Sequence, residues 1–219
     1  MSSSSFPTNS STVLVADASV VINLNATGYA TEIIQSHPGL LAVTDNAFAE
    51  LARGIGNGHS DADQLQALSD SGIVNLVQLS DTGKAIYASL IEGSALRTLD
   101  DGEAATIGYA HEVGGIALID ERKAINLCAN NFPDLAVAST VDLLTHEAVG
   151  NALGKQSQIE AIVRALQIAR MRVPPDHVNL VVDMIGEEVA STCNSLPKSV
   201  RAKPGPRNGR AKKLQTQEV

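Results

Sequence analysis

Short apolar runs alternate with longer amphipathic segments along residues 13–147. The apolar runs are bounded by turn residues, such as Gly114 and Gly115, or by charged clusters, which is typical of buried strands. The strands predicted in this way span residues 13–16, 40–44, 74–78, 116–120 and a short run near 136–139. Because strand-like and helix-like segments alternate, the pattern predicts a mainly parallel sheet covered by helices on both faces.

Segments with helical patterning connect the predicted strands. Thr44 or Asp45 is a suitable N-cap for one of these helices, and Gly54 is a suitable stop. The predicted helices span residues 19–25, 29–36, 45–54, 61–71, 81–92, 102–112, 122–130 and 141–153, and two more, at 155–170 and 175–192, are hinged at Val-Pro-Pro-Asp. We therefore predict a three-layer α/β/α domain over residues 13–153, followed by a helical extension over 154–195.

Charge is distributed unevenly along the 219 residues. Residues 198–219 carry seven lysines and arginines against one glutamate, whereas the whole chain has a net charge of −8, so the preceding part is strongly acidic. The basic segment has few apolar residues, and we predict that residues 196–219 are a disordered tail, as are residues 1–12. Such a tail either binds nucleic acid or only increases solubility, and the sequence leaves both open.

The composition is that of a soluble globular chain, with 44% hydrophobic and 18% charged residues. It contains no run of about 18 apolar residues, which a membrane span requires, and no basic segment at the N-terminus that would indicate secretion. Cys128 and Cys193 have neither metal-ligand nor disulfide spacing. We expect a cytoplasmic protein without a membrane partner.

Four carboxylates are expected at one edge of the predicted sheet. Asp17 and Asp120 each end a predicted strand, Glu50 lies on the helix after the second strand, and Glu103 lies on the helix before the fourth. Ligands bind outside the carboxyl ends of parallel strands. Because clustered carboxylates repel one another, such a group predicts a neutralising cation, and hard oxygen ligands favour Mg²⁺ or Mn²⁺.

Each of these acids also has a purely structural explanation. Asp17 is a good N-cap for the helix that follows it. Asp100 and Glu103 have the spacing of a capping box. Glu50 also suits a solvent-facing helix position, and Asp120 suits a loop that leads into a helix. The prediction of a metal site therefore depends on the four acids in combination.

The combination resembles PIN-domain proteins, most closely the prokaryotic branch related to VapC-type toxins. In that branch a strand ends in Asp-x-Ser or Asp-x-Thr, a helix carries Glu-Leu, another opens with Gly-Glu-Ala, and a strand closes with Ile-Asp-Glu-Arg. The matching motifs here are Asp17-Ala18-Ser19, Glu50-Leu51, Gly102-Glu103-Ala104 and Ile119-Asp120-Glu121-Arg122. The resemblance covers about residues 13–147, and it implies the three-layer α/β/α PIN-like fold.

The resemblance implies a Mg²⁺- or Mn²⁺-dependent endoribonuclease in which Asp17, Glu50, Glu103 and Asp120 bind the metal and catalyse cleavage. Ser19 would support them. Many PIN domains have an aspartate at the position of the third acid, so Asp101 is the alternative to Glu103 there. The resemblance also implies that this is the toxin of a toxin–antitoxin pair, with an antitoxin protein as partner and a homodimer as the assembly.

Hydrolysis of RNA by a metal-activated water would leave a 5′-phosphate and a 3′-hydroxyl. Because the chain is acidic and only 3% aromatic, RNA binding would depend on the metal, on cations such as Arg53, Arg122 and Lys123, and on the tail. A non-enzymatic PIN-fold binding module is the main alternative. A haloacid-dehalogenase-type phosphatase fits poorly, because it needs a second aspartate where this chain has Ser19.

Overall fold

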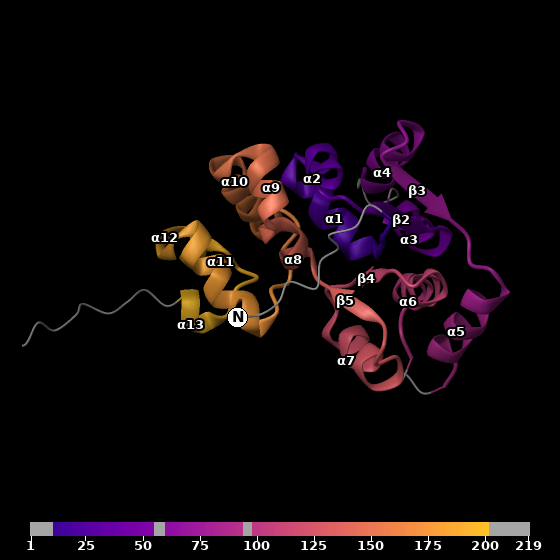
Figure 1. Cartoon of the computed structure of the whole chain (residues 1–219). Coiled ribbons are helices and arrows are strands. Elements are labelled where there is room, and N and C mark those ends of the chain that lie inside the picture. Colours follow the sequence, from indigo (N-terminus) through magenta and orange to yellow (C-terminus); the bar gives the residue numbers. More distant parts are fainter. Residues whose placement is uncertain (1–10, 55–59, 94–97, 202–219) are drawn as a thin grey trace, which may run out of the picture.

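Five parallel strands form the centre of the molecule (Figure 1). The computed structural model describes residues 11–54, 60–93 and 98–201. The strands are β1 (Val13–Ala16), β2 (Leu40–Thr44), β3 (Val74–Val77), β4 (Ile116–Leu118) and β5 (Ala136–Ala138), in the spatial order β3-β2-β1-β4-β5. All four strand pairs are parallel. The chain therefore builds one half of the sheet outward from β1 and then returns to β1 to add β4 and β5.

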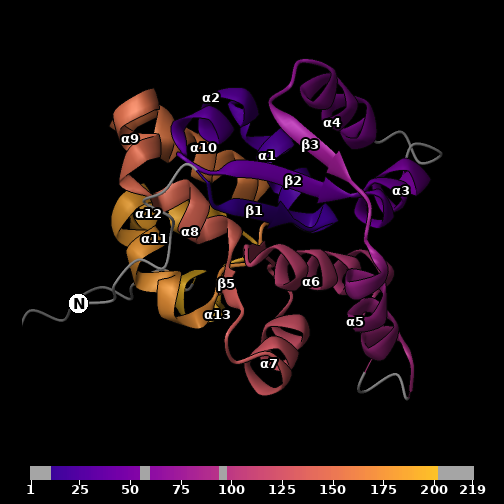
Figure 2. The same cartoon turned by 45° about the vertical axis from the view of Figure 1, so that its right-hand side comes forward.

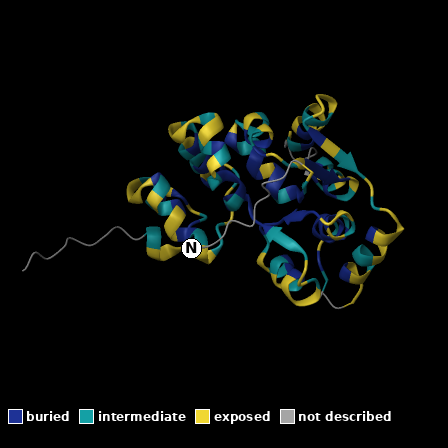
Figure 3. Cartoon of the chain, in the orientation of Figure 1, coloured by how far each residue is buried: buried dark blue, intermediate teal, exposed yellow. Residues whose placement is uncertain are grey.

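Side chains alternate between the two faces of the sheet, and each face has its own core. On β1, Leu14 and Ala16 belong to the larger core, whereas Val15 belongs to the smaller one. Ala117 of β4 also belongs to the smaller core. Both faces of the central strands are therefore buried (Figure 3), as the uninterrupted apolar runs predict.

Helices cover both faces, so the fold is the predicted three-layer α/β/α arrangement (Figure 2). The smaller core is closed by α5 (Asp81–Ile91), α6 (Asp101–Val113) and α7 (Arg122–Asn131). The larger core is closed by α1 (Ala18–Thr27), α2 (Ala30–Ser36), α3 (Asp45–Gly54), α4 (Asp61–Asp70), α8 (Thr140–Thr145), α9 (Glu147–Leu153) and the helices that follow them.

The prediction of one helix over residues 141–153 is wrong, because α8 ends at Thr145 and α9 begins at Glu147. His146 separates them with an extended backbone, and its Nδ1 accepts a hydrogen bond from the N–H of Ala148 at 3.2 Å. The hydrophobic periodicity continues across the break, since Leu144 and Val149 both enter the larger core. Periodicity alone therefore could not reveal it.

The helical extension packs on the same core as the sheet. It consists of α10 (Lys155–Gln167), the 3₁₀ turn η2 (Pro175–His177), α11 (Val178–Ile185) and α12 (Glu187–Thr192). Ile162, Leu166 and Met171 are buried in the larger core. The buried Gln158 side chain donates to the carbonyls of Leu144 and His146 at 2.9 and 3.1 Å, which ties α10 to the break between α8 and α9. Within the described ranges no helix is long and apolar enough to cross a membrane.

The start of the predicted tail is a further correction. Residues 196–201, expected to be disordered, are ordered: Leu196 is buried in the larger core and α13 (Lys198–Arg201) follows it. Arg201 Nε donates to the carbonyl oxygen of Leu196 at 2.9 Å, which closes this last turn. The basic composition of this segment obscured two apolar residues that pack on the larger core, Leu196 and Val200. Residues 1–10 and 202–219 of the two predicted disordered segments lie outside the described residues.

Candidate active site

Asp17 and Asp120 lie where the order of the strands reverses. β1 pairs with β2 on one side and with β4 on the other, so the helices after β1 and β4 leave the sheet on opposite faces. This topology opens a crevice at the carboxyl ends of the two strands, the usual place for a ligand in such sheets. Asp17 directly follows β1, and its N–H donates to the carbonyl of Leu118 at the end of β4. Asp120 follows β4 by two residues.

The two oxygens of Asp17 have different roles. Oδ2 accepts from the Ser19 hydroxyl at 2.9 Å and from the Ser19 N–H at 3.4 Å, so Asp17 is the N-cap of α1. Oδ1 is buried and accepts no hydrogen bond from the described part of the chain. Capping therefore explains one oxygen only. A buried carboxylate oxygen without a partner is costly and is expected to face a ligand or ion.

Three hydrogen bonds fix the orientation of Asp120. Oδ1 accepts from the N–H of Thr140 at 2.8 Å, whereas Oδ2 accepts from the Thr140 hydroxyl at 2.5 Å and from Asn23 Nδ2 at 2.8 Å. Thr140 begins α8 and Asn23 lies on α1, so two helices hold this carboxylate at the edge of the sheet. Asp120 is a fixed part of the crevice.

Glu103 faces the same crevice from the first turn of α6. Its Oε2 accepts from the N–H of Asp100 at 3.4 Å, so the predicted capping box exists. Asp101, the alternative third acid, accepts from the Tyr87 hydroxyl and from Asn46 Nδ2. These contacts hold Asp101 between α3, α5 and α6, whereas Glu103 and Asp100 line the crevice. The geometry thus favours Glu103 over Asp101.

Gly102 creates the space in which Asp17 and Glu50 approach α6. A Cβ atom on Gly102 would lie 2.5 Å from Glu50 Oε2 and 3.1 Å from Asp17 Oδ1. Real Cβ atoms essentially never approach a heavy atom as closely as 2.5 Å. The carboxylates of Asp17 and Glu50 therefore both lie next to the space that the side chain of any residue other than glycine would fill at position 102.

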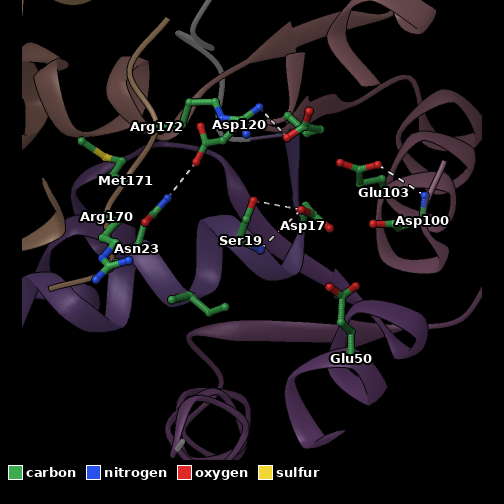
Figure 4. A pocket seen from close by; sticks show the side chains of 13 residues that line it. Asp17, Ser19, Asn23, Glu50, Asp100, Glu103, Asp120, Arg170, Met171 and Arg172 are labelled. Atoms are coloured by element: carbon green, nitrogen blue, oxygen red, sulfur yellow. Dashed lines mark hydrogen bonds and ion pairs between the residues drawn. The ribbon is translucent and has the colours of Figure 1, made fainter. Parts of the chain in front are cut away.

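These side chains line one cavity (Figure 4). Asp17, Glu50 and Glu103 lie on one side of the view, and Arg170, Met171 and Arg172 lie on the other, with Asp120 between them. Among the residues that the structure describes, the lining consists of Asp17, Ser19, Ile22, Asn23, Glu50, Asp100, Glu103, Asp120, Glu121, Ala169, Arg170, Met171 and Arg172. All four acids of the predicted quartet, and Ser19, therefore meet in one place.

Burial and mutual repulsion raise the pKa of each acid in the quartet. Burial alone dominates the upward shift of the Asp17 pKa. Burial and the nearby Asp17 charge raise the pKa of Glu50, and they raise that of Glu103 to about 7. Burial also raises the pKa of Asp120 to about 6, although its hydrogen bonds with Thr140 oppose the shift. A cation among these groups would relieve the repulsion that disfavours their charged forms.

The donor set suits a hard divalent cation, since every acid offers oxygen and Asp17 Oδ1 accepts no hydrogen bond from the residues that the structure describes. In the ranges that the structure describes, however, no three His, Cys, Asp or Glu side chains are close enough together to hold a metal ion. The side chains thus have suitable oxygen donors and line the same cavity. As they lie in the structure, however, they are too far apart to bind one ion together.

Several residues of the cavity belong to no sequence motif that points to a site. For Asp100 the sequence predicts a capping role only, and for Asn23, Arg170 and Arg172 it predicts none. The predicted RNA-binding cations Arg53, Arg122 and Lys123 do not contribute to this cavity lining. The arginines come from the chain after α10, more than 45 residues beyond Asp120. Only the fold brings them to the acids.

A family model described as PIN domain matches residues 13–187 of the chain. The match begins at β1 and ends at the first residue of α12, so it includes α10 and α11 of the helical extension. No curated protein and no solved structure matches the chain.

Proposed function

Because the chain belongs to the PIN-domain family, whose members are in general nucleases, we propose that it is a divalent-metal-dependent endoribonuclease. The observation that carries this proposal is the meeting of Asp17, Glu50, Glu103 and Asp120 in one cavity at the switch point of the sheet. These four acids come from separate parts of the sequence. Their common location supports a shared chemical role.

Each residue of the proposed site has a definite task. Asp17, Glu50, Glu103 and Asp120 would hold Mg²⁺ or Mn²⁺ through their carboxylate oxygens. Ser19 orients Asp17 through the bond to Oδ2 and leaves Oδ1 for the ion. Thr140 and Asn23 orient Asp120 in the same way, as second partners of a ligand commonly do.

A bound divalent ion lowers the pKa of a water molecule and withdraws negative charge from phosphoryl oxygens. The protein contributes the placement of the substrate and a partly buried environment, in which electrostatic interactions are stronger than in bulk water. We propose that the products carry a 5′-phosphate and a 3′-hydroxyl. The resemblance to VapC-type toxins further supports a cytoplasmic toxin with an antitoxin partner and a homodimeric assembly.

A catalytically inactive PIN-fold binding module is the second candidate. It is favoured by one observation, namely that no ready metal-ligand cluster exists within the described residues. Such a module would keep the fold and the acidic cavity for partner contacts. It would not hydrolyse RNA with any metal.

The two candidates make opposite predictions for purified protein and a panel of structured and single-stranded RNAs. We expect the enzyme to cut at least one RNA with Mn²⁺ or Mg²⁺ and to be inactive in EDTA, since the proposed chemistry depends on a bound ion to activate water. Products would be separated on denaturing gels, and their ends tested with a 5′-phosphate-dependent exonuclease. A folded, partner-free protein that cuts no RNA under any of these conditions would favour the binding module.

A further inference from the structure

The turn after α10 brings two arginines to the acidic cavity. Arg170 and Arg172 line it together with six carboxylates, and both side chains are exposed. Met171 between them is 1% exposed, and its N–H donates to the carbonyl of Ala165 at 3.0 Å. The buried methionine anchors this turn to the larger core. Its two charged neighbours are thereby held at the mouth of the cavity.

Arg170 has a backbone conformation that is unusual for its residue type. Among the non-glycine residues that the structure describes, Arg170 is the one with a positive φ, at 56°. Arg170 lies three residues beyond Gln167, the last residue of α10, in the left-handed conformation that glycine adopts more readily than any residue with a side chain. The backbone of this turn therefore favours glycine over arginine.

Among the residues that the structure describes, Arg172 forms an ion pair with one partner, the exposed Glu121. The two side chains form an ion pair in which they are 55% and 41% exposed. Exposed ion pairs contribute little free energy, because water screens the attraction. Arg172 can therefore exchange Glu121 for a stronger anionic partner, such as a phosphate, at little cost. The ion pair with Glu121, which also lines the cavity, meanwhile keeps Arg172 beside it.

The same two arginines line a second, adjacent cavity. Its other lining residues are Asn194 and Ser195, from the segment after α12, and no carboxylate occurs among the described residues that line it. Guanidinium and amide groups are hydrogen-bond donors to phosphate and sugar oxygens, whereas the Ser195 hydroxyl donates to the carbonyl of Leu166 at 3.3 Å. The arginines thus separate an acidic cavity from one that suits a polyanion.

We propose that Arg170 and Arg172 are positioning residues that bind phosphates of the RNA backbone next to the scissile phosphate. The strand would enter across the cavity that they share with Asn194 and Ser195. This proposal rests on the proposed ribonuclease function and specifies how an acidic protein can hold a polyanionic substrate. Arginine suits the task because its planar guanidinium makes paired hydrogen bonds with phosphate oxygens.

The test compares Arg170→Gly, Arg172→Gln and Arg172→Lys with the control Lys155→Gln, using the RNA that the wild type cuts best. Lys155 is exposed at the opposite end of α10, so its replacement removes the same charge far from the cavity. We expect Arg170→Gly and Arg172→Gln each to raise KM about 5- to 10-fold with little change in kcat, as loss of a charge-assisted contact predicts.

The salt dependence separates phosphate binding from a structural effect. In fluorescence anisotropy with labelled single-stranded RNA in EDTA, loss of one phosphate contact should flatten the plot of log Kd against log salt by about 0.7. Arg172→Lys should keep the slope, since it keeps the charge. Arg170→Gly should melt no earlier than the wild type, because glycine is favoured at a positive φ.

The outcomes distinguish the two proposals. In one outcome the wild type cleaves RNA, but Arg170→Gly and Arg172→Gln have the same KM and salt slope as Lys155→Gln. This outcome would overturn the role of the arginines and leave the proposed ribonuclease function intact. A wild type that neither binds nor cuts any RNA would overturn both. Raised KM and a flatter slope in the two cavity variants alone would support the arginines as the phosphate contacts.

Discussion

Asp17→Asn is expected to lower the rate of RNA cleavage by about 10³-fold or more, because stabilisation by a bound metal is worth several kcal/mol. An amide at this position keeps the oxygen that caps α1 through Ser19. It replaces Oδ1, which accepts no hydrogen bond from the described residues, by an NH₂ group, which cannot bind a cation. The change therefore removes one ligand with almost no change in shape. Cleavage would be measured with saturating RNA and Mn²⁺.

The same substitution should not destabilise the fold. Burial raises the pKa of Asp17 in the folded state, so its charge costs stability at pH values above that pKa. A neutral asparagine removes this cost, and the variant should melt at or above the wild-type temperature. Asp134→Asn, an exposed change outside the cavity, is the matched control and should keep full activity. Full activity in Asp17→Asn would exclude Asp17 as a ligand.

Gly102→Ala should lower activity about 10- to 100-fold, since displacement of a positioned group by about 1 Å can have an effect of this size. The new Cβ would lie 2.5 Å from Glu50 Oε2, so the Glu50 carboxylate must move away from this turn of α6. The free energy of unfolding should stay within about 1 kcal/mol of wild type, because a flexible side chain can yield and alanine favours the helix.

Chemical denaturation and Mn²⁺-dependent cleavage, measured on the same preparation of Gly102→Ala, separate the two effects. A stable but weakly active variant would show that the approach of Glu50 and Asp17 to α6 matters for the chemistry. Wild-type activity in this variant would mean that Glu50 does not act from the position described. Loss of folding would contradict the assignment of the contact to a movable side chain.

The layers of the fold could be predicted from local patterning. The predicted bounds of β1 and β2 agree with the structure, because turn residues and charges bound both apolar runs. The break at His146 and the anchoring of Leu196 could not be predicted in this way. Both depend on contacts with distant residues, namely Gln158 for the break and the larger core for Leu196.

The candidate site was predictable in part for the same reason. Asp17 and Asp120 come just after β1 and β4, so a parallel sheet must bring them to one edge. The sequence could not decide between Asp101 and Glu103 as the third acid. The structure favours Glu103, because Asp101 accepts hydrogen bonds from Tyr87 and Asn46 outside the cavity lining. Arg170 and Arg172 follow a helix that carries no motif, and only the packing of α10 on α1 carries them to the cavity.

The most direct measurement of the central claim is calorimetric titration of Mn²⁺ into the RNA-free protein at pH 6 and pH 8, beside Asp17→Asn. With pKa values of about 7 for Glu103 and about 6 for Asp120, a cation must displace protons at pH 6 but few at pH 8. We predict saturable binding to the wild type that is tighter at pH 8 and is lost in Asp17→Asn. A folded wild type that binds no Mn²⁺ at either pH would contradict a metal-dependent active site.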